Sequence, residues 1–71
     1  MYRNPITDSF VELTMTDGKK LFIDARYVAG IFENTYGDRT ETVINMSSGA
    51  HYTVKEKLRN VFSAVVDARQ C

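Results

Sequence analysis

Two side chains in this sequence have the chemistry for acid–base or nucleophilic catalysis. The 71 residues contain one histidine, His51, and one cysteine, Cys71. A histidine acts as a general base only when a nucleophile or substrate lies within hydrogen-bond reach, and His51 falls in a predicted strand. A cysteine acts as a nucleophile only when a neighbouring base activates it, and Cys71 is the last residue. We therefore expect no catalytic residue and interpret His51 as a surface or interface histidine.

Metal and cofactor chemistry is not expected either. One histidine and one cysteine are too few for a zinc site, and a single cysteine cannot form an internal disulfide. The sequence contains no GxGxxG, P-loop, HExxH or CxxC motif. We therefore predict a protein that is not an enzyme and that needs neither a cofactor nor a metal.

Cations and aromatic rings in the predicted loops and at strand ends could hold an anionic ligand. Arginine forks suit phosphate or carboxylate, and tyrosine rings can stack on a base. The candidate ligand-binding residues are Arg26, Tyr27, Tyr36, Arg39, His51 and Lys55. In a symmetric assembly, pockets between subunits could use these groups to hold a small nucleotide-like molecule. The alternative interpretation is that they are ordinary solvated loop residues.

The balance of charges argues against several classes of partner. Lys+Arg and Asp+Glu number 9 each, so the formal net charge is +0. The chain therefore has no basic surface for duplex nucleic acid or an anionic membrane, and an RNA-binding sheet is disfavoured. No apolar run approaches the ~20 residues of a membrane span, and no signal-peptide pattern opens the chain. We expect a small cytoplasmic protein.

These candidate residues must be positioned by short strands and turns. From Ser9 to Met15, apolar and polar residues alternate with the period of a half-buried strand. Asp17-Gly18 then supplies a tight turn, because glycine accepts a positive φ. The predicted strands cover residues 9–15, 21–23, 28–35, 42–46 and 51–55.

Two residues interrupt this strand pattern. We expect Asp24 to cap a short turn through Arg26 and Tyr27, since its carboxylate can accept hydrogen bonds from free backbone N–H groups. Gly30 lies inside a strand pattern, where glycine is typical of a bulge or of a close approach by another backbone or a ligand.

The last part of the chain has helical spacing. The apolar residues at this spacing are Leu58, Val61, Phe62, Val65 and Ala68. Thr53 and Glu56 have the spacing of a capping box, which predicts that the helix starts within the last strand. The fold class is α+β: a small antiparallel β-meander of about five strands with one C-terminal amphipathic helix. Residues 1–8 are expected to be a flexible arm and residues 9–71 a single domain.

One helix can cover only one side of such a sheet. The side predicted to meet the helix carries Val11, Leu13, Met15, Leu21, Ile23, Ile44, Met46, Tyr52 and Val54. The opposite side carries the candidate interface residues Phe10, Phe22, Phe32 and Val43. Burying each such ring contributes about 1.5–3 kcal/mol, so we predict a homo-oligomer, a protein partner or a ligand on this face. Alternatively, the chain's own arm or loops cover it.

The segment from Thr42 to Glu56 carries a resemblance to a known family. It reads TVINMSSGAHYTVKE and resembles the hallmark stretch of the FlbD-like small proteins, approximately T-V-I-x-L-x-x-G-x-x-Y-x-V-x-E. These are called flagellar or swarming-motility proteins in bacteria, and similar short proteins occur in phages and prophages. The resemblance spans roughly residues 10 to 66 and implies a strand-rich sheet with a C-terminal helix, without catalytic residues or a cofactor.

Three functions remain open on this basis. The first is a non-enzymatic homo-oligomeric protein that binds a host protein or a small ligand in the cytoplasm of a bacterium or a phage-infected host. The second is a phage-type protein that sequesters a nucleotide immune signal between subunits. The third is a motility-associated accessory protein. The resemblance also indicates that the loop from Asn34 to Glu41 is longer than usual, and added loops often carry new binding function.

Overall fold

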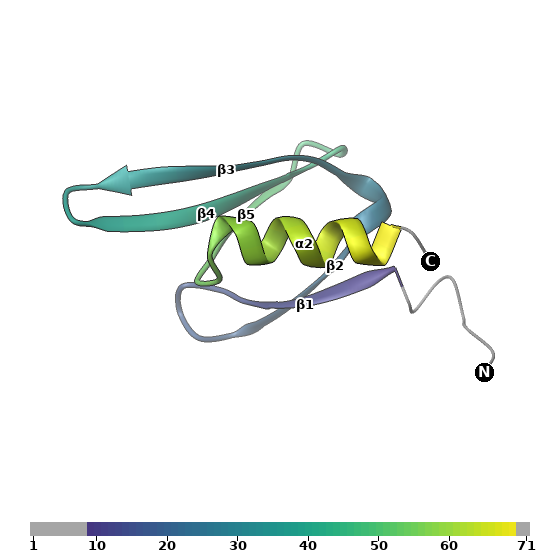
Figure 1. Cartoon of the computed structure of the whole chain (residues 1–71), viewed down its shortest axis with the longest axis horizontal. Coiled ribbons are helices and arrows are strands. Elements are labelled where there is room, and N and C mark those ends of the chain that lie inside the picture. The colour runs from purple at the N-terminus through teal and green to yellow at the C-terminus, as the bar shows by residue number, and fades with distance from the viewer. Residues whose placement is uncertain (1–8, 70–71) are drawn as a thin grey trace.

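The computed structural model describes residues 9–69 of the chain. The elements, in chain order, are β1 (Phe10–Thr14), β2 (Lys20–Asp24), the 3-10 helix η1 (Ala25–Tyr27), β3 (Val28–Tyr36), β4 (Arg39–Met46), β5 (His51–Val54) and α2 (Leu58–Arg69). The predicted α+β class, with five antiparallel strands before one helix, is confirmed (Figure 1). The predicted arm over residues 1–8 and Cys71 lie outside the described residues.

The strands form two antiparallel sheets rather than one continuous meander. β1 and β2 form a hairpin, and β3, β4 and β5 form a three-stranded sheet with β4 in the middle. The sheets meet at one corner, where Met15 and Val54 form a β-bridge and the Lys55 N–H donates to the Thr14 carbonyl at 2.8 Å. β1 therefore follows β5 in space, and β2 and β3 are the outermost strands.

The 3-10 helix η1 separates the two sheets. The Asp24 carboxylate accepts a hydrogen bond from the Arg26 N–H at 3.0 Å, which confirms the predicted cap. This turn redirects the chain after β2, so β3 pairs with β4 and not with β2. The Ser47 N–H donates to the Tyr27 carbonyl at 2.8 Å and thereby ties η1 to the end of β4.

The hydrophobic core lies between α2 and the inner faces of the two sheets (Figure 1). α2 contacts β1, η1 and β3, so the helix packs against both sheets. The buried core residues are Val11, Leu13, Ile23, Ala25, Ile44, Val54, Val61, Val65 and Ala68. Most of them come from the strand side that was predicted to meet the helix, because alternate side chains of a strand share one face.

The β3–β4 hairpin extends past β5 and past the start of α2 (Figure 1). β5 pairs only with residues 42–45, whereas β3 and β4 remain paired out to Tyr36 and Arg39. The segment from Asn34 to Glu41, expected to be a long loop, is therefore mostly paired strand. Gly37, with φ of 62°, makes the tight turn at its tip.

The start of α2 differs from the prediction. Thr53 lies inside β5, opposite Val43, so the predicted capping box is wrong. α2 begins at Leu58, and the Val61 N–H donates to the Lys57 carbonyl at 3.0 Å. No helix within residues 9–69 has the length and apolar character needed to cross a membrane.

Two apolar side chains are not where the sequence pattern placed them. Val43, expected on the open side of the sheet, is only 6% exposed. It sits on the middle strand between Phe32 and Thr53, and these neighbours shield it. Phe62, expected in the apolar stripe of the helix, is 57% exposed.

Candidate binding surfaces

The six candidate ligand residues fall into two groups, one toward each end of β4. One group is Arg26, Tyr27 and His51, and the other is Tyr36, Arg39 and Lys55. The first lies where η1 meets the β4–β5 turn, and the second lies toward the tip of the β3–β4 hairpin. β4 joins the two regions and has 8 residues, so its ends are about 23 Å apart. One chain therefore does not bring these residues into a single site.

Arg26 is already engaged by an acidic neighbour. Its Nε donates to Asp24 Oδ1 at 3.0 Å and its Nη2 donates to Asp24 Oδ2 at 2.6 Å. The hydrogen bonds from Arg26 lower the pKa of Asp24 to about 2. The guanidinium carbon also lies 5.4 Å from the centroid of the Tyr27 ring. Arg26 therefore holds the η1 turn together, and its fork is not free for a phosphate.

A shallow hollow gathers two of the other cations. Its volume is about 250 Å³, and it is lined by Thr16, Arg39, Thr40, Glu41, Val54 and Lys55. Arg39 Nη2 lies 3.5 Å from Glu41 Oε2, so one of the two positive charges has a carboxylate beside it. Lys55 is in no ion pair within residues 9–69. The hollow could hold a small anion through Lys55, with Arg39 shared between the ligand and Glu41.

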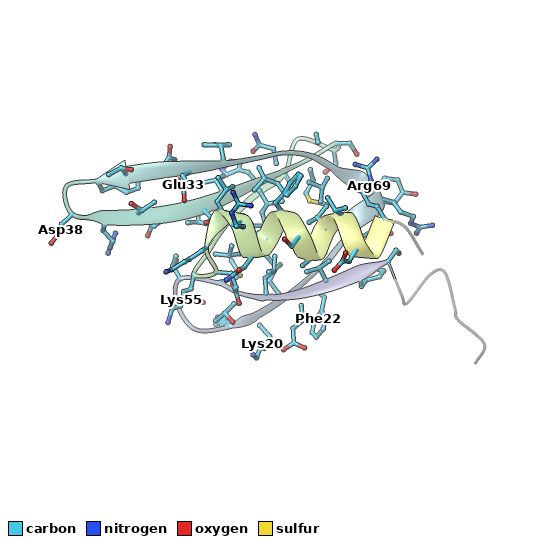
Figure 2. All side chains as sticks on the ribbon, in the orientation of Figure 1. Lys20, Phe22, Glu33, Asp38, Lys55 and Arg69 are labelled. Carbon is cyan, nitrogen blue, oxygen red and sulfur yellow. The ribbon has the colours of Figure 1, made fainter. Side chains whose placement is uncertain are left out.

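Two predicted interface rings lie on one exposed face of the first sheet. Phe10 is 44% exposed and Phe22 is 60% exposed, and both point away from the core side of β1 and β2. Glu12 lies opposite Phe22, and its Oε2 forms an ion pair at 3.2 Å with Nζ of Lys20, which lies on the side of Phe22 away from Phe10. Figure 2 shows Phe22 and Lys20 on the side of the hairpin away from α2. We name the surface formed by Phe10, Glu12, Lys20 and Phe22 the β1–β2 outer face.

The other two predicted interface residues lie on the second sheet. Phe32 is exposed on the side of β3 away from α2. Its cross-strand neighbour Val43 is buried within the chain, so Val43 supports the Phe32 ring and offers little surface of its own. His51 is exposed on the same side of this sheet, opposite Asn45. Asn45 and His51 therefore place polar groups on the same face of the sheet as the Phe32 ring.

A groove between β3 and α2 was not anticipated from the sequence. It has a volume of about 490 Å³ and is lined by Ile31, Glu33, Leu58, Arg59 and Phe62. We name it the β3–α2 groove. A second hollow of about 250 Å³ continues it along α2, past Val28, Gly30 and Val66 to Arg69. Figure 2 places Glu33 at one end of α2 and Arg69 at the other.

Phe62 carried a signal that could have revealed this groove. It directly follows Val61, which is fully buried. Successive residues of an α-helix point about 100° apart, so Val61 and Phe62 cannot both face the centre of one narrow core. A large ring placed beside the buried stripe therefore predicts an apolar surface at the margin of the helix.

The comparisons with known proteins bear on the family. The searches of curated proteins and of solved structures found no match. The family model FlbD, described as flagellar and swarming motility proteins, matches residues 10–71. This match covers all the described strands and the helix, and it agrees with the resemblance carried by the segment from Thr42 to Glu56. The chain therefore belongs to the FlbD family of flagellar and swarming motility proteins.

Proposed function

We propose that this member of a motility-associated family acts as a non-enzymatic, homo-oligomeric binding protein whose β1–β2 outer face docks on a protein partner. The observation that carries the proposal is the exposure of Phe10 and Phe22 on one face. Burying a phenylalanine side chain contributes about 1.5–3 kcal/mol. A chain of this size rarely gains more than ~3–5 kcal/mol from its own core. Covering both rings with a partner would therefore make a large contribution to the free energy of binding.

The surroundings of the two rings support a specific contact. Large exposed apolar surfaces rimmed by polar groups mark protein interaction sites. Here the charges of Glu12 and Lys20 lie beside the rings and neutralise each other at 3.2 Å. A partner that covers Phe10 and Phe22 could thus leave this ion pair at the rim, where it remains hydrated.

Binding rather than catalysis is supported by the position of the single histidine. A general base is normally oriented by a second group and faces a substrate. His51 is exposed at the start of β5, and its ring has no hydrogen-bond partner among residues 9–69. Its ring is therefore not held in one orientation for proton transfer.

The partner surface can be tested by complementation in the organism that encodes this chain. Deleting the gene is expected to reduce swarming, and the unmodified gene is expected to restore it. A double variant, Phe10→Ser with Phe22→Ser, is expected to fold, since both rings are exposed, but to fail to restore swarming. Tyr27→Ser removes a ring of similar exposure that lies in η1, outside both the β1–β2 outer face and β3, and is the matched control.

Each part of the proposal has its own contradicting result. Full swarming with the double variant would reject the β1–β2 outer face, provided that circular dichroism shows both variants folded. Unchanged swarming after the deletion would reject the motility role. Sedimentation of the purified protein at a mass of 8.1 kDa, at all concentrations, would reject homo-oligomerisation.

A second candidate function is capture of a nucleotide-like anion at subunit interfaces, as in a phage-type sequestering protein. The hollow that contains Arg39 and Lys55 is the observation that favours it. Arg26, Tyr27 and His51 lie near the other end of β4. An assembly that joins unlike ends of two copies could place Tyr27 and His51 of one copy and Arg39 and Lys55 of the other around one ligand.

A further inference from the structure

The outer edge of β3 has no partner strand. β3 is 9 residues long, which corresponds to about 30 Å of extended chain. It pairs with β4 along one side, from Val28–Met46 to Tyr36–Arg39, and no strand within residues 9–69 pairs with its other side. Such an edge presents a row of free backbone N–H and C=O groups, which can pair with another extended chain.

This edge lacks most of the features that prevent strand pairing. Edge strands are usually protected by lysine, by proline, by bulges or by being short. β3 carries Glu33 as its one charged residue, and its bulge lies at the beginning, between Val28 and Gly30. The other outer edge, β2, is 5 residues long and has Lys20 and Asp24 at its ends. β3 is therefore the better template for pairing.

Apolar groups flank the free edge on both faces of the sheet. Phe32 is exposed on one face, and the β3–α2 groove with Phe62 lies on the other. A strand added along β3 would extend the sheet and cover both rings. The combination of backbone pairing with flanking apolar pockets is the usual basis of strand addition.

The groove carries one acidic and one basic side chain, so the grooves of two copies can form ion pairs with each other. Glu33 and Arg59 both line the groove, and both side chains are exposed. Neither takes part in an ion pair or side-chain hydrogen bond within the described part of the chain. In a two-fold symmetric contact, Glu33 of each copy can meet Arg59 of the other, so the pair forms twice.

The register of this contact follows from the side chains of β3. Antiparallel pairing about a two-fold axis at Glu33 would set two carboxylates opposite each other, which is unfavourable. With the axis at Phe32, the two rings face each other, and Ile31 of one copy lies opposite Glu33 of the other. Glu33 then enters the groove that Arg59 of the other copy lines.

We propose that two copies associate through antiparallel pairing of their β3 edges, centred on Phe32, with the two β3–α2 grooves facing each other across the axis. This contact rests on the homo-oligomeric function proposed above and names the surface through which the copies meet. It joins the two three-stranded sheets into one sheet of six strands and leaves the β1–β2 outer face of each copy free for a partner.

A reciprocal charge exchange tests this contact between copies. In the variant Glu33→Arg, the arginine at position 33 of each copy meets Arg59 of the other, and in Arg59→Glu two glutamates meet at the same contact. Each variant alone is expected to dimerise about tenfold more weakly than the unmodified protein, because like charges meet twice. A mixture of the two variants is expected to form heterodimers with about the unmodified affinity, because both contacts are then of opposite charge.

Matched controls change the same charges outside the groove. The controls are Asp38→Arg and Lys57→Glu. Asp38 lies at the tip of the same hairpin, Lys57 lies just before α2, and both side chains are exposed. Neither is expected to alter the dimerisation constant in sedimentation velocity. The variant Phe62→Ser, which removes an exposed ring of the groove, is expected to weaken the dimer.

The outcomes separate this contact from the broader function. A monomeric unmodified protein would overturn both the contact and the homo-oligomeric function. An oligomer that Glu33→Arg and Arg59→Glu leave intact, and that Phe10→Ser with Phe22→Ser dissociates, would overturn the β3 contact while homo-oligomerisation stands. A mixture of the charge variants that stays as weakly associated as each variant alone would also overturn the contact.

Discussion

The carboxylate of Glu56 accepts a hydrogen bond from the backbone N–H of Thr14 at 2.9 Å, across 42 residues of sequence. The same turn is held on its other side, where Thr42 Oγ1 donates to the Glu56 carbonyl at 2.7 Å. Glu56 thus connects the end of β1 with β4 just before α2 begins. It fixes the corner at which the two sheets and the helix meet.

Removing this carboxylate should destabilise the fold. Glu56→Ala leaves the Thr14 N–H without its charged acceptor, so we expect a loss of about 1.5–3 kcal/mol in the free energy of unfolding. Glu56→Gln retains an oxygen acceptor and should cost less. Urea denaturation followed by circular dichroism measures both. Equal stability of Glu56→Ala and the unmodified protein would show that this hydrogen bond does not hold the corner.

Stability should fall at acidic pH because of Asp24. The hydrogen bonds from Arg26 lower the pKa of Asp24 from 3.8 to about 2 in the folded protein. A carboxylate with a lowered folded pKa stabilises the protein above its unfolded pKa, and that contribution is lost as the pH falls through the folded value. The loss should therefore occur between about pH 4 and pH 2.

Glu56 contributes in the same direction. Burial alone raises the pKa of Glu56, but hydrogen bonds from the Thr14 and Glu56 backbone N–H groups outweigh this effect and lower it. The variant Asp24→Asn keeps a capping side chain and removes one of these two carboxyl groups with a lowered pKa. Its melting temperature should depend less steeply on pH in the acid range than that of the unmodified protein. An unchanged slope would remove Asp24 from the acid response.

Two glycines should respond oppositely to replacement by alanine. Gly49 has a φ of 97°, so Gly49→Ala should cost about 1 kcal/mol or more. Gly30 is not among the glycines with positive φ, and a Cβ built on it would have no heavy atom within 4 Å. Gly30→Ala should be neutral or stabilise by up to about 1 kcal/mol. Denaturation at a concentration low enough to keep the protein monomeric compares them, and a costly Gly30→Ala would contradict the open space at this position.

Nucleotide binding, if it occurs, should depend on the hollow near the hairpin. A ligand that binds only the folded state raises the melting temperature. At a concentration one hundred times its dissociation constant, it stabilises the folded state by about 2.7 kcal/mol. Thermal unfolding with a panel of cyclic and ADP-ribose-type nucleotides should show this shift for the unmodified protein and lose it in Lys55→Ala. Lys57→Ala, which removes a charge outside the hollow, is the control. No shift with any nucleotide would exclude this function.

Local patterns in the sequence predicted most of the secondary structure. The strand positions, the turn at Asp17-Gly18 and the Asp24 cap all depend on residues within a few positions of one another. Gly30 likewise marked the bulge in β3, and no heavy atom of the chain itself lies within 4 Å of a Cβ built at this position. Alternation, turn chemistry and capping act through the nearest backbone groups, so a single sequence is sufficient to read them.

Predictions failed where a contact between residues distant in sequence outweighed a local pattern. Thr53 and Glu56 have the spacing of a capping box, but the Glu56 carboxylate binds the Thr14 N–H and Thr53 pairs with Val43. Val43 had the parity of an open face, yet its place in the middle strand buries it. Strand order decides such cases, and spacing within one segment does not report strand order.

The sequence by itself determined the α+β class, the family resemblance and the two-sided apolar character of the strands. Only the tertiary structure decided which surfaces remain open: the free edge of β3, the groove beside Phe62 and the separation of Arg26 from Arg39. The physical reason is that a turn or a strand follows from neighbouring residues. A groove exists only after two segments distant in sequence, here β3 and α2, have packed side by side.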